Sequence, residues 1–284
     1  MSELTDIIRS IPGFDGRTDG ENEYMGADGL IYCEKCHTPK QSRMEVLGEE
    51  RVIGHLCRCE AEAFDREEAE RKARKQRERV NAWRAQGLSV SRWHTHTFAN
   101  DDRRDSTASG ICRNYTYRFD QMLSGNRGLL MYGGVGCGKT YLAAAIANEL
   151  VEQGWYVLMD TLPGLIARMT ADFGADRDYW MGKIEKAHLM VIDDFGVERS
   201  TEFVTEQVYE IINARYRANK PLIVTTNLSL DQLGAESGVG RLRIYDRIRE
   251  MCVPLLVAGE SRRKTIARQM RREMGDLLGG ADEV

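Results

Sequence analysis

The sequence predicts an α/β fold, a parallel sheet flanked by helices, preceded by a small zinc-binding domain and a helical linker. Two observations predict the sheet: apolar strand-like runs alternate with helical patterns between residues 128 and 257, and a glycine-rich loop joins the first run to the next helix. Two close cysteine pairs predict the small domain. The expected boundaries are 1–60 for the zinc-binding domain, 61–94 for the linker and 95–284 for the α/β domain.

Composition limits the partners that this chain can have. Its 284 residues are 42% hydrophobic and 30% charged, which suffices for one large core and one accessory segment. A net charge of −4 gives no global field toward nucleic acid, so any DNA contact must be local. There is no apolar run of membrane-spanning length, and Met1 to Gly13 lacks a signal-peptide core. We expect a cytoplasmic protein without a membrane partner, whose seven cysteines are thiols or metal ligands.

The cysteine pairs predict a tetrahedral Zn²⁺ site. Twenty residues separate the pair with two intervening residues from the pair with one, and a segment this short has too little core to fold without metal. His37 and His55 lie beside the pairs and could each replace a cysteine, although we favour four sulfurs. The expected ligands are Cys33, Cys36, Cys57 and Cys59.

The segments around these cysteines are polar. Residues 1–29 contain only one weak amphipathic piece, at Leu4 to Ile11. Glu60 to Gln86 is dense in Glu, Arg, Lys and Ala, which predicts a solvated helix ending near Gly87. Its basic run, residues 71–77, could touch nucleic acid, but the glutamates around it favour a solvated face.

The glycine-rich loop fits the phosphate-binding pattern G-x-x-x-x-G-K-[ST], with a strand expected at 128–132 and a helix at 140–153. Backbone N–H groups of such a loop converge on an anion, and the helix N-terminus adds positive charge there. Lys139 would reach the β- and γ-phosphates of ATP, and the Thr140 hydroxyl would bind Mg²⁺. The expected nucleotide-binding residues are Gly133, Gly134, Val135, Gly136, Cys137, Gly138, Lys139, Thr140 and Tyr141.

The remaining α/β pattern continues to residue 257. Helices are expected at 162–169, 203–218 and 240–250. The further strands are expected at 155–159, 188–192, 221–225 and 253–257. Ligands of such a sheet bind at the carboxyl ends of its strands.

Polar residues follow two of these strands. Asp193 would hold Mg²⁺ through water, and Asp194 would orient or deprotonate the attacking water. Glutamate is more usual at the second position, so Glu198 is also considered. Asn227 follows the strand at 221–225 and could lie beside the γ-phosphate.

The helix expected at 240–250 carries arginines. Arg243 and Arg247 are one turn apart, opposite Ile244 and Ile248. An arginine supplied to a neighbour's γ-phosphate stabilises the transition state of hydrolysis, while a solvated basic helix is equally compatible with this composition.

Together these residues resemble the AAA+ ATPases of the DnaC/DnaI helicase-loader and IstB group, over residues 95 to 267. The segments that carry the resemblance are 133–140, Val191 to Gly196, Val224 to Leu228 and Asp246 to Ile248. The resemblance implies that Asn227 is the sensor 1 residue. It implies an arginine finger at Arg247, with Arg243 as its companion, and sensor 2 at Arg263, with Arg262 in reserve.

The resemblance also implies function. Such loaders use ATP to assemble on single-stranded DNA and deliver the hexameric replicative helicase, and several, including phage-encoded ones, have an N-terminal zinc-binding domain that contacts the helicase. DNA would be engaged by the helix pair at 162–186, which offers Arg168, Arg177 and Lys183. The second possibility is the ATPase helper of a DNA transposase, a branch that ordinarily lacks the cysteine segment.

Overall fold

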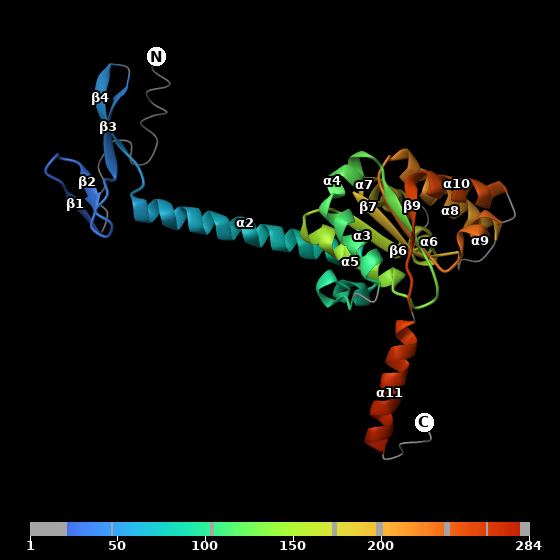
Figure 1. Ribbon diagram of the computed structural model, residues 1–284. Coiled ribbons are helices and arrows are strands. Elements are labelled where there is room, and N and C mark those ends of the chain that lie inside the picture. The colour runs from blue at the N-terminus through green and yellow to red at the C-terminus, as the bar shows by residue number, and fades with distance from the viewer. Residues whose placement is uncertain are drawn as a thin grey trace. The chain divides into compact units, whose positions relative to one another are not determined.

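The computed structural model describes residues 22–46, 48–102, 105–171, 175–196, 201–235, 239–259 and 261–278. The chain divides into two compact units, Met1–Arg77 and Glu78–Val284, and Figure 1 shows the elements of each. The amphipathic piece at residues 4–11 and the alternative acid Glu198 lie outside the described residues. No described helix is both long enough and apolar enough to span a bilayer.

The first unit consists of two short β-ribbons and the start of a helix. Strands β1 (Glu23–Met25) and β2 (Ile31–Cys33) pair antiparallel, as do β3 (Gln41–Val46) and β4 (Glu49–Gly54), with Gly48 in the left-handed region (φ 80°) between them. Within its described part, residues 22–77, only Cys33, Gln41 and Cys57 are buried. The described part of the unit therefore has no hydrophobic core apart from its cysteines.

Helix α2 (Arg58–Gly87) matches the solvated helix predicted for 60–86. It has no apolar stripe, and Glu68 pairs with Lys72 one turn later. Only Val80 and Gly87 of the helix are buried. Val80 joins the core of the second unit, as do Leu88 and Trp93, so residues 78–94 pack with the α/β domain although the predicted boundaries assign them to the linker.

The second unit is built on a five-stranded parallel sheet in the order β6-β7-β8-β5-β9. The strand of this sheet that comes first in the sequence, β5, thus lies between β8 and β9, which come last. The predicted fold class and all five strands are confirmed, with shifts of a few residues at their ends. The strands are β5 (Gly128–Tyr132), β6 (Val157–Thr161), β7 (Leu189–Phe195), β8 (Leu222–Thr226) and β9 (Cys252–Leu256).

Helices cover both faces of this sheet. Alternate side chains of β5 show why: Leu129 and Met131 belong to one core cluster, and Leu130 belongs to the other. The first cluster is covered by α3 (Ser106–Tyr117), α4 (Phe119–Ser124) and α5 (Lys139–Glu152). The second is covered by α6 (Leu162–Thr170), α7 (Ala175–Lys186), α8 (Glu202–Arg217), α9 (Leu230–Gly234) and α10 (Val239–Met251).

Two 3₁₀ turns, η1 (Ser91–Thr95) and η2 (Phe98–Asn100), pack on α5. The buried amide of Asn148 holds η1 there, because its Nδ2 donates to the carbonyls of Trp93 (2.8 Å) and of His96 (2.9 Å), the residue that caps η1. The last described helix, α11 (Arg262–Leu278), follows β9.

Candidate nucleotide and metal sites

The glycine-rich loop joins β5 to α5 through a backbone that requires glycine. Gly133, Gly136 and Gly138 have φ values of 147°, 82° and 111°. A Cβ at Gly133 would lie 2.3 Å from the carbonyl oxygen of Val257, and one at Gly136 would lie 2.2 Å from Ser261 Oγ. The loop is therefore packed tightly against the segment that follows β9.

Lys139 begins α5, and its ammonium group lies within this loop. Its Nζ donates to the carbonyls of Gly133 (2.9 Å) and Gly134 (2.8 Å) and to Asn227 Oδ1 (2.8 Å). The predicted sensor residue and the loop lysine, 88 positions apart, thus meet in the fold. Among the other predicted loop residues, Val135 is exposed and Cys137 is buried. Tyr141 points away, donating from its hydroxyl to the Thr97 carbonyl (2.8 Å).

The next residue, Thr140, meets the end of β7. Its Oγ1 donates to Asp193 Oδ1 (2.9 Å), and the same oxygen accepts from Thr225 Oγ1 on β8 (2.6 Å). Asp193 is buried, and this burial raises the pKa of its carboxyl, while the hydrogen bonds from the two threonines lower it. The Thr140 hydroxyl and a carboxylate oxygen of Asp193 are thereby joined at the carboxyl edge of the sheet, which is a donor set that suits Mg²⁺.

The second acid is placed by an irregularity in β7. The register with β8 shifts between Ile192 and Phe195, and Asp194 has a left-handed backbone (φ 57°). In a regular strand, consecutive side chains point to opposite faces. Here both carboxylates are held at the strand ends, because Asn227 Nδ2 donates to Asp194 Oδ1 (3.2 Å).

Thr225 was not expected from the sequence. The residue is 1% exposed, and its hydroxyl donates to Asp193 and accepts from the backbone N–H of Asp194 (2.9 Å). A hydroxyl residue directly after the apolar run Leu222 to Val224 is the signal that could have identified it, since a buried hydroxyl needs a partner.

The predicted arginines fall into two groups. Arg247, on α10, is half-buried against Tyr209 and Tyr216 of α8, while Arg243 is exposed one turn away. The side chains of Arg262 and Arg263, at the start of α11, lie outside the described residues.

Helices α6 and α7 bring aromatic and basic side chains together. Lys183 Nζ lies 4.6 Å from the ring centroids of both Tyr179 and Trp180, and the Arg168 guanidinium lies 5.4 Å from that of Trp180. Arg168 is also ion-paired with Asp160, at the end of β6. The other predicted cation, Arg177, is turned to α8, where it pairs with Glu210.

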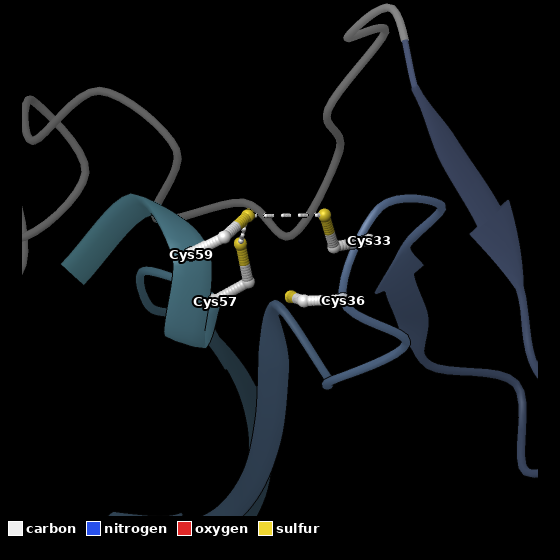
Figure 2. A group of neighbouring side chains, drawn as sticks. All are labelled: Cys33, Cys36, Cys57 and Cys59. Carbon is white, nitrogen blue, oxygen red and sulfur yellow. Dashed lines mark hydrogen bonds between the residues drawn. The ribbon is translucent and has the colours of Figure 1, made fainter. Parts of the chain in front are cut away.

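In the first unit the four predicted cysteine ligands come together. Cys33 ends β2 and Cys36 lies in the turn that follows, while Cys57 directly precedes α2 and Cys59 lies in its first turn (Figure 2). Their sulfur atoms all lie within 4.8 Å of one another, with 3.6 Å between Cys33 and Cys59 and 3.3 Å between Cys57 and Cys59. A tetrahedral site with Zn–S bonds of about 2.3 Å has sulfurs about 3.8 Å apart, so the cluster fits zinc.

Neighbouring residues orient this cluster. His37 adopts a left-handed conformation (φ 53°), and its N–H donates to the Cys33 carbonyl (2.9 Å), which closes the first turn. Thr38 Oγ1 accepts from the backbone N–H of Arg58 (3.0 Å), which links the two cysteine pairs. The His55 ring contacts the Leu56 carbonyl (3.1 Å). Neither histidine belongs to the compact group of ligand atoms, which consists of the four sulfurs.

Comparison with known proteins supplies the family context. A family model described as IstB-like ATP binding protein matches residues 44–270. The replicative helicase loader DnaI of Bacillus subtilis is 27% identical over 148 residues, covering 48% of each chain. An insertion-sequence ATP-binding protein of Sinorhizobium fredii is 29% identical over 164 residues, covering 55% of this chain and 53% of its own. The chain thus spans about half the length of the curated relatives it matches.

The fold has a solved counterpart as well. A crystal structure of DnaI superimposes with a TM-score of 0.52 at 26% identity, covering 62% of this chain and 95% of that one. The α/β unit with its five-stranded parallel sheet is therefore shared with a helicase loader of known structure.

Proposed function

The chain belongs to the IstB-like ATP-binding protein family, and we propose that it hydrolyses ATP to load a replicative DNA helicase onto single-stranded DNA. The observation that carries the proposal is the convergence of Lys139, Asp193 and Asn227 at the carboxyl ends of three parallel strands. Similarity to a replicative helicase loader, in sequence and in structure, supports helicase loading as the process that ATP hydrolysis serves.

In the proposed reaction each group has a separate task. Backbone N–H groups of the loop and the Lys139 ammonium bind the phosphates. Thr140 and Asp193 would hold Mg²⁺, which when bound neutralises charge on the transferring phosphoryl group. Asp194 orients the attacking water, and Asn227, which contacts both Asp194 and Lys139, keeps that carboxylate beside the phosphate-binding lysine. Arg247, assisted by Arg243, acts on the ATP of a neighbouring copy, and Arg263 senses the bound nucleotide.

We assign the two partners to different parts of the chain. The aromatic and basic residues of α6 and α7 suit a single-stranded nucleic acid, because bases stack on aromatic rings while cations attract the backbone. The zinc-binding unit is assigned to the helicase. These assignments keep the predicted domain roles, with residues 1–60 as the docking domain, 61–94 as the linker and 95–284 as the ATPase, except that residues 78–94 of the linker pack with the ATPase unit.

The ATPase proposal is tested by Lys139→Ala. Loss of the ammonium removes its phosphate contact, so ATP turnover should be abolished. The matched control is Lys72→Ala, an exposed lysine on α2 outside the site. Unchanged turnover in Lys139→Ala would remove the central claim.

The loader proposal is tested by native mass spectrometry of the full chain mixed with the replicative helicase of its host, with ATP and Mg²⁺. We expect a stable complex that Cys36→Ser/Cys59→Ser weakens, since that variant loses two zinc ligands. Cys112→Ser, a buried cysteine of the other unit, is the control. Absence of any complex with the helicase would contradict the loader assignment.

The second candidate function is an ATPase helper of a DNA transposase. Similarity to an insertion-sequence ATP-binding protein favours it. Self-assembly that depends on added DNA, without helicase binding, would select it; native mass spectrometry with and without DNA measures both.

A further inference from the structure

Arg247 is packed between two aromatic rings of the neighbouring helix α8. Tyr209 and Tyr216 lie seven residues apart, on one side of α8, and the Arg247 guanidinium lies 4.9 Å and 5.6 Å from their ring centroids. Arg247 Nη2 also donates to the Tyr209 hydroxyl (3.1 Å), and Nη1 donates to the Arg243 carbonyl (3.2 Å). The Tyr216 ring is fixed in turn, since its hydroxyl donates to Glu250 Oε1 (3.0 Å).

This arrangement holds the arginine without neutralising it. Arg168 and Arg177 are ion-paired with Asp160 and Glu210, whereas Arg247 forms no ion pair among the described residues. Its partners are two ring faces, a hydroxyl and a carbonyl. Aromatic rings attract a guanidinium through their quadrupole and leave its positive charge available to an external anion.

Two further features set Arg247 apart from a packing residue. Each Nη has a second N–H for which the described residues offer no acceptor, and the buried Nε also has no hydrogen-bond partner among them. A guanidinium has five N–H donors, and since the Nε is buried, the second N–H of each Nη is what remains for an anion. The two rings and the two hydrogen bonds restrict the rotamers of the Arg247 side chain before an anion arrives. This restriction lowers the entropic cost of binding the anion.

We propose that Tyr209 and Tyr216 are positioning residues, which hold Arg247 in the orientation that reaches the ATP phosphates of a neighbouring copy of this chain. The inference rests on the proposed function, because it requires Arg247 to act in trans. The two tyrosines touch neither ATP nor the reacting atoms and act only through the arginine.

The test uses mixed assemblies of two inactive variants of the full chain. The donating subunit carries Lys139→Ala and supplies Arg247, while the hydrolysing subunit carries Arg247→Ala and keeps its own ATP site. Their mixture should recover turnover that neither shows alone. Adding Tyr209→Leu/Tyr216→Leu to the donating subunit should lower the recovered kcat about tenfold, with KM for ATP unchanged.

Three controls separate positioning from folding. The same leucine pair in the hydrolysing subunit should leave the recovered kcat within about twofold, because that subunit supplies no arginine. Tyr209→Phe/Tyr216→Phe in the donating subunit keeps both rings and should retain most of the recovery. Tyr117→Leu in the donating subunit alters an exposed tyrosine of α3 and should have no effect.

The outcomes are distinct. If the leucine pair lowers the recovered kcat equally in either subunit, the tyrosines have only a structural role and the inference is wrong. If the leucine pair in the donating subunit does not lower the recovered kcat, the inference is also wrong. No recovery in the parent mixture would mean that Arg247 is not supplied in trans, and the proposed arrangement and this inference would both fall.

Discussion

Arg215 is the largest fully buried side chain among the described residues, and it has no acidic partner. It donates five hydrogen bonds to main-chain carbonyls, namely two to Pro221 and one each to Ile184, Ala187 and His188. These carbonyls lie at the end of α7, the start of β7 and the start of β8. A single guanidinium thus joins three elements, and burial lowers its pKa.

Arg215→Met should lower the free energy of unfolding by about 3 kcal/mol, because it leaves several buried carbonyls without a donor. Arg215→Lys should recover little of this loss, since one ammonium group cannot reproduce the planar fork. Urea unfolding at neutral pH measures both. Arg217→Met, on the exposed side of the same helix, is the control, and an equal effect there would contradict the explanation.

Thr225 gives a second prediction at this scale. Thr225→Val removes the hydroxyl that fixes both acids, so it should raise the Mg²⁺ concentration needed for half-maximal ATP turnover by roughly tenfold, the effect of about 1.4 kcal/mol. Thr225→Ser keeps the hydroxyl and should stay close to the parent. Equal Mg²⁺ dependence in the two variants would show that the hydroxyl does not support the acids.

At the scale of elements, the hydrophobic pattern of the sequence predicted the strands of the parallel sheet better than the segments outside it. Apolar runs predicted every strand of the sheet, because strands buried on both faces need a continuous apolar sequence. The strands of the zinc-binding unit were not predicted, since that unit has almost no buried apolar face to give them a pattern. The core positions of Trp93 and Phe98 were not predicted, because both residues lie in 3₁₀ turns, which have no helical or strand period.

The candidate site was likewise predicted in its residues but not in the contacts between them. The loop, both acids, Asn227 and the cysteines were identified from local motifs. Their contacts depend on strand order and register, which sequence spacing does not encode. The bulge at the end of β7, the Asn227 contact to Lys139 and the tyrosines around Arg247 were therefore found only in the structure.

His188, at the start of β7, makes the stability of the α/β unit depend on pH. Its Nδ1 accepts from the backbone N–H of Tyr156 (3.0 Å), which requires a neutral ring. Burial, followed by the charge of Lys220, lowers the His188 pKa below 6.5. As pH falls through 6.5, the unfolded state therefore takes up the proton first, and the free energy of unfolding decreases.

Urea unfolding at about pH 7.5 and about pH 5.5 measures this dependence. His188→Asn should be less stable than the parent at the higher pH and lose less stability on acidification. His94→Asn, a histidine of η1 outside this contact, is the control. The same acid sensitivity in His188→Asn and the parent would exclude His188 as its source.

At the scale of the whole molecule, the two units depend on different sources of stability. The α/β unit has two apolar clusters around its sheet, whereas the described part of the first unit buries little apart from two cysteines and a glutamine. Metal binding and folding should be coupled only in the first unit.

Elemental analysis should therefore find about one zinc per chain. Its removal by a chelator should abolish the ordered structure of the first unit and leave the thermal transition of the α/β unit unchanged, as followed by calorimetry and circular dichroism. Cys36→Ser/Cys59→Ser should reproduce the chelated state, and Cys252→Ser should retain the metal. A metal-free protein with both units folded would contradict the zinc assignment.

For the proposed ATPase, the left-handed backbone at Asp194 decides which substitution of this residue would trap the protein with its substrate bound. Among non-glycine residues, aspartate and asparagine adopt that conformation most readily, so Asp194→Asn removes the charge and preserves the bulge in β7. Alanine or glutamine there would add backbone strain of about 1–2 kcal/mol. The isosteric amide is thus the substitution of choice for imaging assemblies arrested with unhydrolysed ATP.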